Sequence, residues 1–206
     1  MKHFRTPTLA ILAGACLSLL GTNALAESTY GYSPSGTGTI TTSARLNLVI
    51  NVPKLILLRV GGDGTAITDL IWNAGPTWSG APGTLPVSDV SNQATTWGGT
   101  APTVTITNPA AVTASAWTNS SGGGSLAYTA TDFGAGGPTL GNITVTPGTG
   151  LAHPTPVALA TASTGPATFT KNALATGTWS FALVGTPTAW TAGQYTTQIT
   201  YKATSL

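Results

Sequence analysis

Charged and reactive side chains are scarce in this chain, and their scarcity excludes most kinds of chemistry. Of its 206 residues only 6% are Asp, Glu, Lys or Arg, with two histidines and one cysteine. General acid–base, nucleophilic and metal catalysis all need such groups held close together. After residue 26 the only histidine is His153, and cysteine is absent. We therefore expect a disulfide-free protein that is not an enzyme and uses no cofactor.

The charges that follow residue 26 cancel one another. The formal net charge of +2 comes from Lys2 and Arg5, near the amino end. A chain with few, balanced charges has no electrostatic attraction for nucleic acid, so we expect no nucleic-acid partner. Low net charge also weakens self-repulsion and so favours association. The remaining charged residues are Arg45, Lys54, Arg59, Lys171, Lys202, Glu27, Asp63, Asp69, Asp89 and Asp132.

Residues 1–26 have the pattern of a signal peptide. Lys2 and Arg5 give a positive start, an apolar run follows over residues 8–20, and Ala24-Leu25-Ala26 is a small-x-small cleavage pattern. The run is short for a bilayer crossing, which disfavours the alternative of a retained anchor. We therefore expect a protein that is exported through the inner membrane, to the cell surface or the extracellular space.

The composition after the signal peptide favours β-structure. Glycine (26) and proline (14) are abundant, but an apolar content of 41% is too high for a disordered coil. Thr, Val, Ile and aromatic residues prefer the pleated surface of a sheet. Short alternating runs between Gly, Pro, Asn and Ser clusters predict a sandwich or barrel. We expect an all-β fold with one domain over residues 44–206, preceded by a flexible lead-in over residues 27–43.

The clearest alternating run covers residues 44–52. All its even positions are apolar, and among the odd positions only Val49 is, which is typical of a half-buried strand. Pro53 interrupts it, and residues 54–60, apolar nearly throughout, predict a second strand buried on both faces. We expect long loops between Trp72 and Pro102. Further strands are predicted at 103–107, 125–133, 142–146, 155–160 and 178–184 and within 193–203.

The opening and closing runs resemble those of secreted bacterial fimbrial (pilin) subunits. Such subunits begin with an alternating strand, a short break and a second apolar strand. They end in a Gly-x-Tyr turn that leads into a final alternating strand, as Gly193-Gln194-Tyr195 through Tyr201 does here. Lacking cysteine after residue 26, the chain is more similar to the cysteine-free subunits of alternative chaperone–usher pili than to the classical ones. It departs from them in its longer lead-in and its many tryptophans.

The resemblance implies an immunoglobulin-like β-sandwich, complete or lacking one strand, that polymerises by strand exchange. The amino-terminal strand of one subunit would fill a groove in the next, which is β-augmentation between chains. It also implies a role in adhesion or biofilm, with a periplasmic chaperone and an outer-membrane usher as partners besides the subunit itself. The alternative is that residues 44–52 form the first strand of their own sheet, since alternation alone fits both. The partner-strand residues would be Ala44, Leu46, Leu48, Ile50 and Val52.

Six tryptophans support a second hypothesis, a secreted or surface-displayed carbohydrate-binding β-sandwich. Trp179 lies in an alternating run and is predicted to be core. Trp78 and Trp97 lie in the loop-rich middle and Trp190 beside the final turn, so these three are the candidate glycan contacts. Large aromatic side chains also serve packing, which is the competing explanation. A third class, an outer-membrane barrel, also has alternating strands, but the prolines disfavour it.

Motifs for metals or phosphates are weak. Asp63 and Asp69 lack the repeated acidic oxygens of a calcium loop. His153 is a lone histidine, predicted to lie in a loop, and makes a poor metal site. The glycine clusters at 122–124 and 134–137 lack the strand and Lys-Ser/Thr frame of a phosphate loop. The sequence thus predicts no catalytic, cofactor-binding or metal-binding residue.

Overall fold

The computed structural model describes residues 27–206, and the predicted signal peptide lies outside them. The described residues form nine strands and two short 3-10 helices, with no α-helix, which confirms the predicted all-β class. Contacts divide the chain into two units, with the boundary between Val52 and Pro53. All nine strands belong to the second unit, which begins at Pro53.

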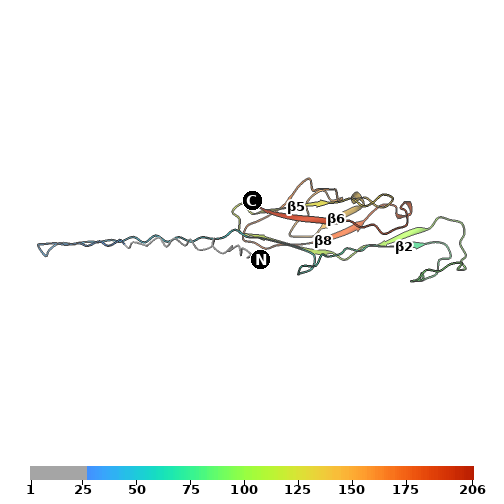
Figure 1. Cartoon of the computed structure of the whole chain (residues 1–206), viewed down its shortest axis with the longest axis horizontal. Helices are drawn as coiled ribbons and strands as arrows, with labels where there is room; N and C mark the ends of the chain where they lie inside the picture. Colours follow the sequence, from blue (N-terminus) through green and yellow to red (C-terminus); the bar gives the residue numbers. More distant parts are fainter. Residues whose placement is uncertain (1–26) are drawn as a thin grey trace, which may run out of the picture. The chain divides into compact units, whose positions relative to one another are not determined.

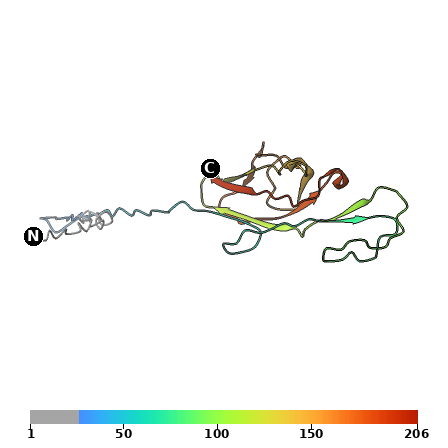
Figure 2. The same ribbon diagram turned by 45° about the vertical axis from the view of Figure 1, so that its right-hand side comes forward.

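The strands form three antiparallel sheets (Figures 1 and 2). The four-stranded sheet has the order β1-β4-β8-β6, and the three-stranded sheet has the order β7-β5-β9. Strands β2 and β3 pair only with each other. The bounds are β1 (Ile56–Val60), β2 (Asn73–Thr77), β3 (Thr103–Thr107), β4 (Val112–Thr118), β5 (Gly124–Ala130), β6 (Ile143–Pro147), β7 (Ala167–Phe169), β8 (Ala175–Leu183) and β9 (Ile199–Ser205), with 3-10 helices η1 (Leu140–Asn142) and η2 (Pro187–Ala189).

The two larger sheets share one hydrophobic core. Trp179 and Phe181 enter it from β8, and Leu126 and Tyr128 enter it from β5. Each of these side chains is at most 3% exposed. The Trp179 indole N–H donates to the Leu151 carbonyl at 2.9 Å, so this large side chain is buried without an unpaired polar atom. The alternation of Trp179 and Phe181 is therefore a core face, as their spacing predicts.

Strand β4, which the sequence pattern does not predict, lies in the middle of the four-stranded sheet. Its buried positions alternate with half-buried ones, but they hold small or polar residues such as Ala114, Ala116 and Thr118. Small side chains allow other chain segments to approach closely. On neighbouring β8, an added Cβ at Gly177 would lie 2.5 Å from the Leu151 carbonyl oxygen. Close packing rather than large apolar side chains thus makes this region of the core.

Several predicted strands occur with small shifts of their bounds. Residues 103–107 are β3, and the runs near 125, 142 and 178 are β5, β6 and β8. The predicted strand at 155–160 is wrong, because these residues make only isolated bridges beside β6 and near Gly165. The prediction that 54–60 is buried on both faces is also wrong. Strand β1 is an edge strand with one solvent face, on which Leu57 is 55% exposed.

The connection between β1 and β4 carries a separate two-stranded ribbon. Its strands β2 and β3 pair over five residues each, and every residue of β2 is exposed. Figure 2 shows this ribbon apart from the strands of the two larger sheets. Strand β2 falls within the region where long loops are predicted, whereas residues 78–102 contain no strand. The missed strand contains Gly75 and Pro76, which weaken any sequence signal for a strand.

Candidate functional site

A large groove opens onto the core between the free edges of the two larger sheets. Its volume is about 1420 Å³. Leu58 and Val60 of β1 line one side, and Ile199 and Tyr201 of β9 line another. Core residues from β6 and β8, including Phe181, also line it. The groove thus reaches core residues at a place where neither flanking strand has a second neighbour.

The flanking strands come together at one end of the groove. There the Asn119 side chain accepts from the Leu55 N–H at 2.7 Å and donates to the Pro53 carbonyl at 2.7 Å. The next residue, Ser120, donates its hydroxyl to the carbonyl of Leu206, just after β9. The lining residues come instead from the far half of β1 and the near half of β9. The adjacent pair Asn119 and Ser120 therefore ties the start of β1 to the end of β9.

Strand β9 presents its unpaired backbone and its inward side chains at the same residues. The Leu206 N–H donates to the Gly123 carbonyl at 2.9 Å, so Leu206 and every second residue before it face β5. The other set faces the free edge, and its side chains are half-buried against the core side. Among residues 27–206 no second strand pairs with this edge. This set is Ile199, Tyr201, Ala203 and Ser205.

In strand β1 as well, the residues with unpaired backbone groups are those whose side chains face the core. The Gly61 N–H donates to the Thr113 carbonyl at 2.8 Å, which turns the odd-numbered residues of β1 toward β4. The even-numbered residues Ile56, Leu58 and Val60 therefore direct their backbone groups away from β4, while their side chains are half-buried. In the described part of the chain β4 is the only partner of β1. Unpaired backbone groups of both strands thus border the groove, at Leu58 and Val60 of β1 and at Ile199 and Tyr201 of β9.

Beneath Tyr201 lies a buried histidine that sequence reasoning places in a loop. His153 does lie between strands, but it is only 7% exposed, among the rings of Tyr128, Trp179, Phe181 and Tyr201. Its Nε2 is 2.8 Å from the Tyr201 hydroxyl. Burial lowers the pKa of His153 from 6.5 to about 4, so the imidazole is neutral at pH 7. Burial also raises the pKa of Tyr201, and the neighbouring Tyr128 adds to the effect.

The predicted partner-strand segment, residues 44–52, forms no strand in the structure. No residue between 27 and 55 is assigned to a strand, and all five apolar positions are exposed. The exposed fractions are 78% for Leu46, 84% for Leu48, 86% for Ile50 and 75% for Val52. Ala44 is likewise exposed. The apolar positions of the alternating pattern are therefore all exposed in the structure.

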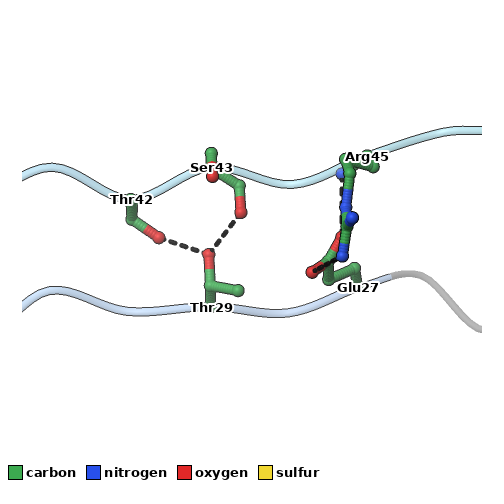
Figure 3. A network of polar contacts seen from close by, with 5 residues as sticks. All are labelled: Glu27, Thr29, Thr42, Ser43 and Arg45. Carbon is green, nitrogen blue, oxygen red and sulfur yellow. Dashed lines mark hydrogen bonds and ion pairs between the residues drawn. The ribbon is translucent and has the colours of Figure 1, made fainter.

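Residues 27–45 fold back on themselves and are joined by polar contacts (Figure 3). The Arg45 guanidinium donates to both carboxylate oxygens of Glu27, at 2.9 and 3.0 Å. This hydrogen bonding lowers the pKa of Glu27 and raises that of Arg45. The Thr29 hydroxyl also bonds Thr42 and donates to the Ser43 carbonyl. These contacts thus join the start of the predicted lead-in to its end and to Arg45, the second residue of the partner-strand segment.

The three candidate glycan contacts do not share one site. Trp190 lines the groove, whereas Trp78 and Trp97 lie in the connection between β2 and β3. The Trp97 ring is 56% exposed, and its N–H donates to the Thr100 carbonyl at 2.6 Å. The Trp78 N–H donates to the Thr95 hydroxyl at 3.1 Å. The carbohydrate-binding alternative therefore stays a prediction from the sequence.

Sequence reasoning missed a groove residue with an unusual environment, Trp72. Its ring packs against the core cluster, and its indole nitrogen is buried without any hydrogen-bond partner. The sequence gives no clear signal for this position, because Leu70, Ile71 and Trp72 are all apolar and show no alternation. In the described residues no group of three His, Cys, Asp or Glu side chains could hold a metal ion.

Within the described part of the chain, no helix is both long and apolar enough to cross a membrane. Comparison with known proteins gives no relative: no family model, no curated protein and no solved structure matches this chain.

Proposed function

We propose that this protein is a non-enzymatic structural subunit of an extracellular surface filament, assembled by β-strand exchange. In this proposal the segment Ala44–Val52 of one copy completes the sheet of the next copy along its groove. The observation that carries the proposal is that one chain contains both an unfilled apolar groove and an exposed segment with the alternation of a strand. Residues 53–206 have an apolar groove bordered by unpaired strand edges, and residues 44–52 have an exposed alternating apolar face.

The strand order supports an immunoglobulin-like sandwich that lacks its last strand. In the seven-stranded immunoglobulin fold, strands A, B, E and D form one sheet, and C, F and G form the other. Reading β1, β4, β8 and β6 as A, B, E and D reproduces the first sheet order. Strands β5 and β9 then correspond to C and F, and within residues 27–206 no strand pairs with β9 on the side where G would lie. The groove borders β9 at residues 199–201, the part of the strand nearest its start.

The free edge of β9 also fits an incoming strand, because its unpaired backbone groups and its core-facing side chains belong to the same residues. An added strand would pair with the outward backbone groups of residues such as Ile199 and Tyr201 and place alternate side chains into the groove. The even-numbered apolar residues of 44–52 supply that alternation. Burying their side chains contributes on the order of 10 kcal/mol before ordering costs are subtracted. The contact is head-to-tail and does not close on itself, so repetition produces a fibre.

The remaining parts of the proposal depend on the resemblance to fimbrial subunits. An apolar groove that is open before assembly favours aggregation, so a folding partner would have to cover it. The resemblance names that partner as a periplasmic chaperone and the assembly platform as an outer-membrane usher. Export, display on the cell surface and a role in adhesion or biofilm belong to the same proposal.

A matched pair of substitutions tests strand exchange. Ile50→Asp places a charge on the apolar face of the segment, whereas Asn51→Asp places the same charge on the neighbouring, opposite face. We expect Ile50→Asp to abolish filaments, because a buried unpaired carboxylate costs several kcal/mol, and Asn51→Asp to retain them. Electron microscopy of cells producing each variant provides the measurement. Filaments of normal abundance from Ile50→Asp, or from a chain lacking residues 27–52, would overturn the proposal.

A further inference from the structure

Residues 66–72 line the groove but are not part of any sheet. Leu70 and Trp72 are half-buried against the core cluster, whereas Asp69 and Ile71 are exposed. The last four residues thus alternate as a strand does, yet none of residues 66–72 is assigned to one. We name residues 66–72 the cover segment.

The cover segment is held by few polar interactions. Its one hydrogen bond to another part of the chain, within residues 27–206, is from the Gly62 N–H to the Thr68 hydroxyl at 3.0 Å. No backbone–backbone hydrogen bond involves residues 66–72. The apolar contacts of Leu70 and Trp72 therefore provide most of its attachment. A segment of this kind opens at low free-energy cost.

The burial of the Trp72 indole N–H destabilises the packed position of the cover segment. This nitrogen is the one buried side-chain nitrogen or oxygen in the described residues that has no partner. Leaving such a donor unpaired costs about 1–3 kcal/mol. Displacement of the segment would return this N–H to water or to a new acceptor. The packed position of Trp72 is thus less stable than its buried area suggests.

We propose that the cover segment is an internal substitute for the partner strand, which the incoming segment of another copy displaces. This inference rests on the proposed function. Leu70 and Trp72 would occupy part of the space that alternate side chains of Ala44–Val52 take after exchange. In the free subunit the cover shields the apolar groove, and the unpaired Trp72 N–H favours its release. Assembly would then be slowed by the fraction of subunits that is closed.

The kinetics of peptide binding test the cover. The recipient is the full chain carrying Ile50→Asp, so that it cannot donate its own segment, and the probe is a fluorescent peptide of residues 44–52. We expect Trp72→Ala to raise the association rate constant about tenfold and to leave the dissociation rate constant nearly unchanged, because it removes a closed state. Trp97→Ala, which removes an exposed indole outside the groove, should change neither constant.

Three outcomes separate the hypotheses. Slower or unchanged association with Trp72→Ala, while the peptide still binds, overturns the proposed role of the cover segment and leaves strand exchange intact. Faster dissociation from Trp72→Ala would mean that Trp72 contacts the bound peptide, which also overturns the role of the cover segment. Peptide binding by none of the recipients overturns the proposed function itself.

A fluorescence measurement covers the case in which Trp72→Ala does not fold. The difference in emission between the Ile50→Asp recipient and the same chain with Trp72→Phe reports Trp72 alone. We expect this difference emission to shift to longer wavelength when the peptide is added, because the indole moves from the core to water. An unshifted difference spectrum at saturating peptide contradicts the displacement.

Discussion

At the scale of single residues, the fold keeps His153 neutral by burying it. Its ring is surrounded by four aromatic side chains, and its Nε2 contacts the Tyr201 hydroxyl. None of the five carboxylate residues after residue 26 is among these contacts. A protonated imidazole at this position would therefore be a buried charge without a counter-ion. Because Tyr201 also lines the groove, His153 supports one wall of the proposed binding site.

This environment predicts that acid destabilises the domain. The pKa of His153 is about 4 in the folded protein and 6.5 in the unfolded chain. Above pH 6.5 both states are neutral at this residue, so the contribution is zero. Between pH 6.5 and about 4 the unfolded state binds more protons, and the free energy of unfolding falls as the pH falls. The total loss is about 3 kcal/mol.

Urea unfolding at intervals between pH 7 and pH 4 measures this dependence. The matched variant is His153→Gln, which keeps a polar side chain of similar size but does not titrate. We expect its stability to be nearly constant between pH 6.5 and pH 5, although lower overall. A wild-type midpoint that stays constant over the same range would contradict the assignment.

At the scale of elements, the attachment of β1 depends on Asn119. Its side chain accepts from the Leu55 N–H and donates to the Pro53 carbonyl. Its backbone N–H donates to the Leu55 carbonyl at 3.3 Å. Asn119→Ala removes the two side-chain bonds. We expect it to lower the free energy of unfolding by about 1–2 kcal/mol and to speed hydrogen exchange of the β1 amides.

The control for Asn119→Ala is Leu57→Thr. It changes an exposed side chain of the same strand to another residue that is common in strands, and should change stability by less than about 0.5 kcal/mol. We call the two side-chain bonds of Asn119 to Pro53 and Leu55 the clamp. Equal effects of the two substitutions, or normal hydrogen exchange of the β1 amides in Asn119→Ala, would show that the clamp does not stabilise β1.

The elements differ in how far the sequence could predict them. Strands β3, β8 and β9 carry Val, Ile and aromatic residues in alternation, and that pattern indicates them correctly. Strand β4 was missed because Ala and Thr at its buried positions give little contrast with their neighbours. Strand β7 spans three residues, too few for periodicity to register. Burial of small residues depends on what packs against them, which a single sequence does not contain.

The candidate site was predictable only in part. Alternation over 44–52 identifies an apolar face, and the structure places that face in solvent. The groove itself arises from residues far apart in sequence, such as Leu58, Phe181 and Ile199, so no local motif could indicate it. The sequence predicts a loop region that begins at Trp72, because the dense turn residues after it dominate the pattern.

At the scale of the whole molecule, association is expected to depend little on ionic strength. The residues after position 26 carry five basic and five acidic side chains, and the one charged residue of the 44–52 segment is Arg45. Arg45 is paired with Glu27. An apolar strand exchange without charge steering should change its rate by less than about twofold between low and high salt.

Light scattering of the assembling wild-type chain at about 0.02 M and 0.5 M sodium chloride measures this dependence. A rate that falls by an order of magnitude as salt is added would point to an electrostatic interface. The proposed groove would then be the wrong contact.

The clamp at Asn119 has a mechanical consequence for a filament of the proposed kind. Only Pro53, Lys54 and Leu55 separate the exchanged segment from β1, so tension between neighbouring subunits enters β1 at its amino end. Pulling along the strand loads its five pairs with β4 together, in shear, rather than opening them one by one. The Asn119 amide bears this load first, so in a fibre under flow it would act before the ladder between β1 and β4.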